Sequence, residues 1–107
     1  MLNWTDEQSE IFARCVELWG EESQWLLALE ELSELQKELI LGMRRKKGKN
    51  LPEIIEEMAD VYVTLEQIRR ICNIPAVDIQ NHADKKMARL KERQDKWGAA
   101  SKAVTPA

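Results

Sequence analysis

The sequence contains little glycine, proline, histidine or cysteine, and each scarcity excludes a class of protein. Four glycines and three prolines among 107 residues supply too few turns for an all-β fold. The single histidine, His82, excludes di-iron sites, zinc hydrolase sites and catalytic triads, which need placed imidazoles. The two cysteines, Cys15 and Cys72, have no metal-type spacing, and we expect them to be reduced core residues.

Signals for membranes, secretion and nucleic acid are also missing. No apolar run approaches the roughly 18 residues that a membrane span needs. The opening MLNWTDEQSE has neither the basic region nor the apolar stretch of a signal peptide. The net charge of −3 argues against a nucleic-acid polymer as partner, and no glycine-rich phosphate loop is present. We therefore expect a cytoplasmic protein that binds neither membrane nor nucleic acid.

Hydrophobic residues recur at helical spacing through four segments of the chain. The segments are separated at Gly20, in the basic stretch GMRRKKGKN (42–50) and in NIPAVD (73–78). This pattern predicts an all-α domain over residues 1–97, a four-helix bundle whose short connections favour antiparallel neighbours. The small, unpatterned residues 98–107 are expected to form a disordered tail.

Two residue types mark where the helices begin. Thr5 and Gln8 have the spacing of a capping box, in which each side chain binds the other residue's backbone N–H. Pro52 and Pro75 stand where a proline is tolerated in the first turn of a helix. These signals predict helix starts near residues 5, 51 and 75.

Two of the predicted helices carry a pair of acids three residues apart. The stretch LEELSELQKEL (29–39) contains Glu31 and Glu34, and EIIEEMAD (53–60) contains Glu57 and Asp60. At about 100° per residue, both pairs lie on the same side of their apolar stripes, so packed antiparallel helices could bring them to one groove. The stripes centre on Leu32, Leu39, Met58 and Leu65.

Charge repulsion separates two interpretations of these acids. Glutamates beside an apolar stripe are often plain solvated surface. If the four carboxylates converge, however, charges about 6 Å apart repel by roughly 2–3 kcal/mol per pair at an effective dielectric constant of about 20. Such a cluster needs a cation, and carboxylates together with water and phosphate oxygens suit Mg²⁺ or Mn²⁺.

These residues resemble the MazG-like all-α nucleoside triphosphate pyrophosphohydrolases, in which Glu-x-x-Glu on one helix is followed by Glu-x-x-Asp on the next. The matching motifs are ELSE (31–34) and EMAD (57–60), in the context WGEESQWLLALEELSELQKEL, EIIEEMADVYVTLEQI and KKMARLKER. The resemblance covers roughly residues 15 to 95. The last motif departs from the Lys-x-x-Asn-like pattern of larger family members, which leaves the phosphate contacts unassigned.

The resemblance implies hydrolysis of a (deoxy)nucleoside triphosphate to the monophosphate and pyrophosphate. Glu31, Glu34, Glu57 and Asp60 would then hold Mg²⁺, and Glu34 or Glu30 would orient or deprotonate the attacking water. It also implies a homodimer or a dimer of dimers.

Three further residues are candidates for substrate binding. Lys86 and Arg89 could contact phosphate, although solvated residues on a charged helix are the plainer interpretation. Trp25 could stack on a base, because every base offers a face, although such a residue is more often core. Two other functions stay open for the whole chain: a non-catalytic helical interaction module, and an enzyme like phosphoribosyl-ATP pyrophosphohydrolase.

Overall fold

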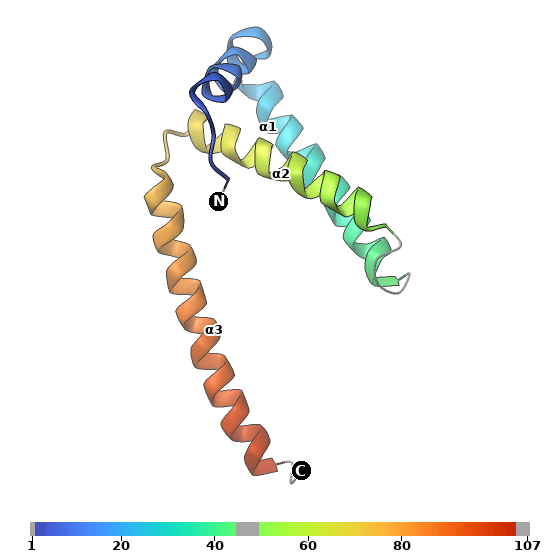
Figure 1. Cartoon of the computed structure of the whole chain (residues 1–107), viewed down its shortest axis with the longest axis vertical. Coiled ribbons are helices and arrows are strands. Elements are labelled where there is room, and N and C mark those ends of the chain that lie inside the picture. The colour runs from blue at the N-terminus through green and yellow to red at the C-terminus, as the bar shows by residue number, and fades with distance from the viewer. Residues whose placement is uncertain (1, 45–49, 105–107) are drawn as a thin grey trace. The chain divides into compact units, whose positions relative to one another are not determined.

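The computed structural model describes residues 2–44 and 50–104, with side chains through residue 99, and these residues form three helices and no strand. The helices are α1 (Asp6–Arg44), α2 (Leu51–Ile71) and α3 (Ala76–Val104) (Figure 1). The all-α class is thereby confirmed. The contacts divide the chain into two compact units, residues 1–73 and 74–107, and each is described by itself. The prediction of a single domain over residues 1–97 stays a prediction.

α1 joins two segments that the sequence predicts as separate helices. Gly20 lies between them with φ 83° and ψ 160°, a conformation that is almost confined to glycine. The predicted break therefore occurs as a kink within α1 rather than as a loop. α1 also extends through Arg44, so that the predicted loop at 42–50 begins later than expected; residues 45–49 lie outside the described part of the chain.

The predicted helix start at Thr5 is confirmed in detail. The backbone N–H of Thr5 donates to Gln8 Oε1 at 2.9 Å, and the backbone N–H of Gln8 donates to Thr5 Oγ1 at 3.1 Å. This reciprocal pair satisfies two donors that the first turn of a helix leaves unpaired.

α1 and α2 form an antiparallel hairpin, and three side-chain pairs along it set its register. Gln24 pairs with Gln67, Glu31 approaches Asp60, and Glu38 accepts hydrogen bonds from Asn50. The seam between the helices follows a heptad-like spacing on each helix. Its members on α1 are Gln24, Ala28, Glu31, Leu35 and Glu38, and those on α2 are Ile54, Glu57, Val61, Thr64 and Ile68, all buried or part-buried.

The apolar stripes that the sequence predicts as the core lie outside this seam. Leu32, Leu39, Met58 and Leu65 are each between 42% and 50% exposed, whereas the buried apolar residues are Phe12, Ala28 and Val61. The hairpin therefore packs through a seam of which half the members are polar or charged, and it leaves its most apolar faces open. The prediction that these four residues centre the core is therefore wrong for the hairpin, because the helices meet along a seam to one side of them.

A buried ion cluster fastens the first part of α1 to the end of α2. Glu66 is only 6% exposed, and it binds Arg69 at 2.7 Å and Arg70 at 2.6 Å. Arg70 also donates to Ser9 Oγ at 3.1 Å, and its guanidinium lies 4.8 Å from the centroid of the Phe12 ring. These hydrogen bonds, those from Arg69 first, lower the pKa of Glu66 and keep it ionised.

In the second unit, α3 carries the basic residues of the chain's last third. Residues 76–97 and 99 are exposed, and Gly98 is part-buried. α3 continues through Val104, so residues 98–104, for which composition predicts disorder, are helical. The alanines of this segment have a high intrinsic helix propensity, which accounts for the difference. Residues 105–107 of the predicted tail lie outside the described residues.

Candidate metal centre

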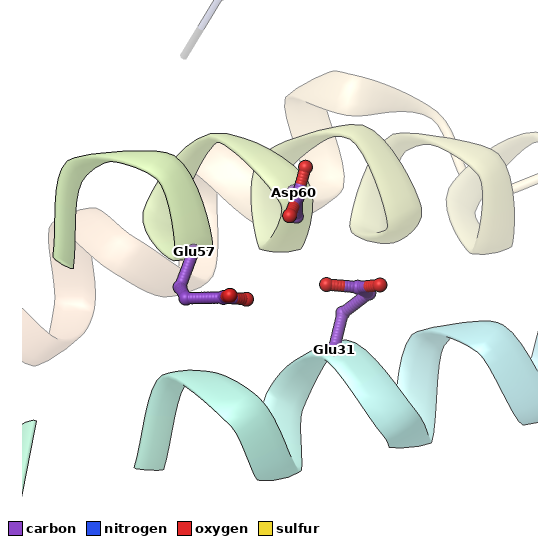
Figure 2. Close-up of side chains that lie close together, drawn as sticks. All are labelled: Glu31, Glu57 and Asp60. Carbon is purple, nitrogen blue, oxygen red and sulfur yellow. The ribbon is translucent and has the colours of Figure 1, made fainter. Parts of the chain in front are cut away.

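Three of the four predicted carboxylates meet in the hairpin seam. One carboxylate oxygen each from Glu31, Glu57 and Asp60 lies within 4.8 Å of the other two. Glu31 comes from α1, while Glu57 and Asp60 come from adjacent turns of α2 (Figure 2). Figure 2 shows the side chains of Glu31 and Glu57 extending into the space between the two helices. The seam spacing places these two acids at positions where a coiled coil would carry apolar residues.

One oxygen of this cluster is buried without a partner. Glu57 Oε2 is inaccessible to solvent and accepts no hydrogen bond from the described residues. A buried carboxylate oxygen that is left unpaired costs more free energy than an ordinary unpaired polar group because it carries charge. A cation beside Glu57 would satisfy this oxygen.

The electrostatics of the cluster follow from partial burial and like charge. The pKa of Glu31 is raised by desolvation first, and then by the negative charges of Asp60 and Glu57. The pKa of Glu57 is also raised, by desolvation first and then by the charges of Asp60 and Glu34, although a hydrogen bond with Glu31 acts in the opposite direction. Both carboxyls therefore hold a proton more tightly than an isolated glutamate does. A divalent cation bound beside them would instead favour the ionised carboxylates and lower both pKa values.

The spacing suits a small hard cation. Oxygen ligands lie about 2.0–2.1 Å from Mg²⁺, so ligands on opposite sides of the ion are about 4.2 Å apart and neighbouring ligands about 3 Å apart. Separations within 4.8 Å need only small side-chain movements to reach these values. Three carboxylates leave further positions for water and for phosphate oxygens.

Glu34 and Glu30 lie beside the cluster rather than in it. Glu34 is exposed on α1, one turn beyond Glu31, and its charge contributes to the raised pKa of Glu57. Glu30 is exposed next to Glu31 and contributes to the raised pKa of Glu31. The structure thus brings together three of the predicted metal ligands and leaves Glu34 at the rim.

The predicted substrate-binding residues are all exposed. Trp25 is 44% exposed on α1. Lys86 and Arg89 are exposed on α3, in the second unit. Their roles therefore stay predictions.

Sequence reasoning missed several polar residues that shape the hairpin. Asn50 is 7% exposed and donates from Nδ2 to both the backbone carbonyl and the carboxylate of Glu38, at 2.9 Å each. Gln67 Nε2 donates to Phe12 O at 2.9 Å and to Gln24 Oε1 at 3.1 Å. The seven-residue spacing of Gln24, Glu31 and Glu38 was the available signal, because it places all three on one helix face.

An apolar cavity of about 250 Å³ lies in the same unit. It is lined by the N-terminal segment, the first part of α1, the start of its second part and α2. Cys15 is part-buried and contributes to this lining. Both thiols are free, as expected. Cys72, however, is exposed at the end of α2, so the prediction that it is a core residue is wrong. The lining residues are Trp4, Gln8, Ile11, Phe12, Cys15, Trp19, Gln24, Leu27, Val63, Thr64 and Gln67.

No family model, curated protein or solved structure matches the chain. Among the described residues, no helix is both long and apolar enough to cross a membrane. The case for a function therefore depends on the residues of the site and on the motifs that they form.

Proposed function

We propose that this chain is a Mg²⁺-dependent nucleotide pyrophosphohydrolase of the MazG-like kind, which hydrolyses a (deoxy)nucleoside triphosphate to the monophosphate and pyrophosphate. The observation that carries the proposal is the convergence of Glu31, Glu57 and Asp60 within 4.8 Å, with Glu57 Oε2 buried and unpaired. The motifs ELSE and EMAD, which contain these acids, support the family. Mn²⁺ is an alternative cation with the same ligand preference.

Each acid has a role in this proposal. Glu31, Glu57 and Asp60 would hold the cation, and Glu34 at the rim would serve either as a further ligand or as a base. The bound cation would neutralise triphosphate charge and lower the pKa of coordinated water. The pairs Gln24–Gln67 and Glu38–Asn50 fix the register that brings the three ligands together, so little reorganisation is needed on binding.

The proton of the attacking water needs an acceptor that is not a cation ligand at that moment. Glu34 and Glu30 are both exposed and adjacent to the cluster. We assign the base role to Glu34 or Glu30, and to Glu30 if Glu34 is itself a ligand.

We further propose that the chain assembles as a homodimer or a dimer of dimers in the cytoplasm. Leu32 and Leu39 on α1 and Met58 and Leu65 on α2 are half exposed, and apolar faces of this kind mark interaction surfaces. The kink at Gly20 divides α1 into two segments. We propose that these two segments, α2 and α3 are the four helices of an antiparallel bundle.

A pyrophosphate-release assay with Mg²⁺ and a panel of (deoxy)nucleoside triphosphates tests the activity. We expect release with at least one triphosphate and its loss in Glu57→Gln, which removes one charge from the cluster. Glu53→Gln is the matched control, because Glu53 is exposed one turn earlier on α2 and lies outside the cluster. A Glu57→Gln variant with full activity would remove Glu57 from the ligand set.

The same panel distinguishes the alternatives. Release from phosphoribosyl-ATP alone would identify that related activity instead. No release from any substrate, together with no Mg²⁺-induced rise in melting temperature, would leave the chain a helical interaction module.

A further inference from the structure

Asn50, the residue before α2, is buried although only half of its side-chain amide is satisfied. The residue is 7% exposed. Its Nδ2 donates to the backbone carbonyl and to the carboxylate of Glu38, at 2.9 Å each. Its Oδ1 is inaccessible to solvent and accepts no hydrogen bond from the described residues. A buried acceptor without a partner costs free energy, so stability alone does not favour asparagine at this position.

Helix capping does not account for this asparagine either. Asparagine is favoured before the first turn of a helix because its side-chain oxygen accepts a hydrogen bond from an N–H of that turn. Asn50 occupies this position, and its backbone carbonyl accepts a bond from Ile54 N at 3.0 Å. Its side chain, however, makes no capping hydrogen bond and reaches across to α1. Asn50 therefore joins the two helices instead of closing the end of one.

A glycine on α1 lets the two helices approach closely at this point. A Cβ atom at Gly42 would lie 3.1 Å from Asn50 Oδ1 and 3.0 Å from Ile54 Cδ1, closer than ordinary van der Waals contact. The end of the Ile54 side chain could turn aside, whereas the Asn50 amide is fixed by its two bonds to Glu38. The missing side chain at Gly42 thus sets how closely Asn50 packs against α1.

This contact shares its register with the acid cluster. Glu57 follows Asn50 by seven residues on α2, and Glu31 precedes Glu38 by seven residues on α1. Seven residues are two helical turns, about 10 Å at 1.5 Å per residue, and they return to the same face of a paired helix. A helix is stiff over two turns, so a shift or rotation of α2 at Asn50 would also move Glu57.

We infer that Asn50 is a positioning residue for the proposed cation site, because it holds α2 at the distance and rotation at which Glu57 faces Glu31. The inference rests on the proposed function for the cation itself. Asn50 is two turns away from Glu57, so it acts through that ligand and not on the cation directly. Removing a residue that orients metal ligands lowers metal affinity, and this effect is separable from any change in stability.

Cation affinity and fold stability are measured separately in the same variants. Mn²⁺ alone is the probe for affinity, since its electron paramagnetic resonance signal distinguishes the free ion from the bound ion. Urea unfolding in the presence of a chelator measures stability. Asn50→Ala removes the hydrogen bonds to Glu38 without changing any charge. We expect this variant to bind Mn²⁺ about tenfold more weakly than the parent chain does.

Two controls distinguish positioning from a general loss of stability. Phe12→Leu trims a buried side chain in the first part of α1, which should lower stability and leave Mn²⁺ affinity unchanged. Asn81→Ala makes the same substitution at an exposed position on α3 and should alter neither quantity. The inference is overturned if Phe12→Leu loses as much Mn²⁺ affinity as Asn50→Ala does, or if Asn50→Ala binds Mn²⁺ as tightly as the parent.

Two variants of Glu38 test the same contact from α1, and they decide the matter if Asn50→Ala does not fold. Glu38→Gln and Glu38→Ala both remove one negative charge, but only glutamine keeps a side-chain oxygen that can accept from Asn50 Nδ2. We expect Glu38→Ala to bind Mn²⁺ more weakly than Glu38→Gln by a factor of about three or more, the effect of one net hydrogen bond. Equal affinities in these two variants would refute the positioning role.

The positioning role and the proposed activity fail separately. Mn²⁺ affinity that depends on Asn50, in a chain that releases no pyrophosphate, supports the positioning role and refutes the activity. Unchanged Mn²⁺ affinity in Asn50→Ala, in a chain that releases pyrophosphate, refutes the positioning role and leaves the activity standing. A parent chain that binds no Mn²⁺ refutes the cation site and, with it, the role of Asn50.

Discussion

Gln67 on α2 donates a hydrogen bond of 3.1 Å to the side-chain oxygen of Gln24 on α1. Each glutamine lies seven residues from a member of the acid cluster, Asp60 and Glu31 respectively. Because seven residues are two turns on one face of a paired helix, the amide pair and the acid pair share one register. A slip of the hairpin would separate both pairs at once.

Gln67→Leu is predicted to destabilise the fold. It removes the donor to two buried acceptors, Phe12 O and Gln24 Oε1, and unpaired buried acceptors of this kind cost about 1–3 kcal/mol. Urea unfolding should show a lower midpoint with an unchanged slope. Gln80→Leu is the control, because Gln80 makes its bond to Asp84 on an exposed surface and should change stability by less than about 0.5 kcal/mol. Equal losses in the two variants would contradict the role given to Gln67.

Gly20→Ala is predicted to destabilise the kinked helix by about 1–3 kcal/mol, the usual cost of such a backbone conformation in a residue with a side chain. The strain arises from the dihedral angles at Gly20 rather than from crowding, since a Cβ there would meet nothing within 4 Å. Gly98→Ala should instead be neutral or stabilising by up to about 1 kcal/mol, because Gly98 lies within α3 and alanine favours helix. Thermal unfolding of both variants checks the contrast, and a Gly20→Ala variant as stable as the parent would exclude the kink in solution.

Stability of the metal-free protein is predicted to fall as pH rises above the ordinary glutamate pKa of 4.5. Glu31 and Glu57 have raised pKa values in the fold, mainly through desolvation and then through neighbouring carboxylates. The folded state therefore binds more protons than the unfolded chain from about 4.5 up to the raised values, and stability is lost across that window and not regained above it. Glu66 has a lowered pKa, so its contribution is lost only below that window.

Melting temperatures from about pH 4 to about pH 8 in the presence of a chelator measure this fall, which should shrink in Glu57→Gln. Saturating Mg²⁺ should abolish most of it in the parent and much less in the variant, since the cation replaces the proton as the neutralising charge. The same pH dependence in parent and variant would mean that Glu57 does not titrate as inferred.

Leu39→Glu is predicted to weaken the proposed assembly. The residue is half exposed on the apolar face of α1, and a charge buried there in an interface without a partner is unfavourable. Sedimentation or light scattering should report a smaller species at the same protein concentration. Ser33→Glu adds the same charge at an exposed position off that stripe and should leave the assembly intact. A parent chain that is monomeric at all concentrations would refute the dimer.

The features that depend on short sequence distances were predictable. The capping box at Thr5 and Gln8, the glycine break at Gly20 and the proline near the start of α2 act within one or two turns. The acid motifs were visible for the same reason, since residues three apart share a helix face. Asn50, Gln24 and Gln67 were not visible as partners because their contacts join residues far apart in the chain.

The sequence by itself determined that the chain is helical, where its breaks fall and which acids share a face, because helix periodicity and capping are local properties. The tertiary structure decided which face of each helix meets the other. It placed glutamines and acids in the seam and left the leucine stripes open, since side-chain hydrogen bonds between distant residues and the fit of the two helices set the register. That register joined Glu31 to Glu57 and Asp60 and left Glu34 at the rim.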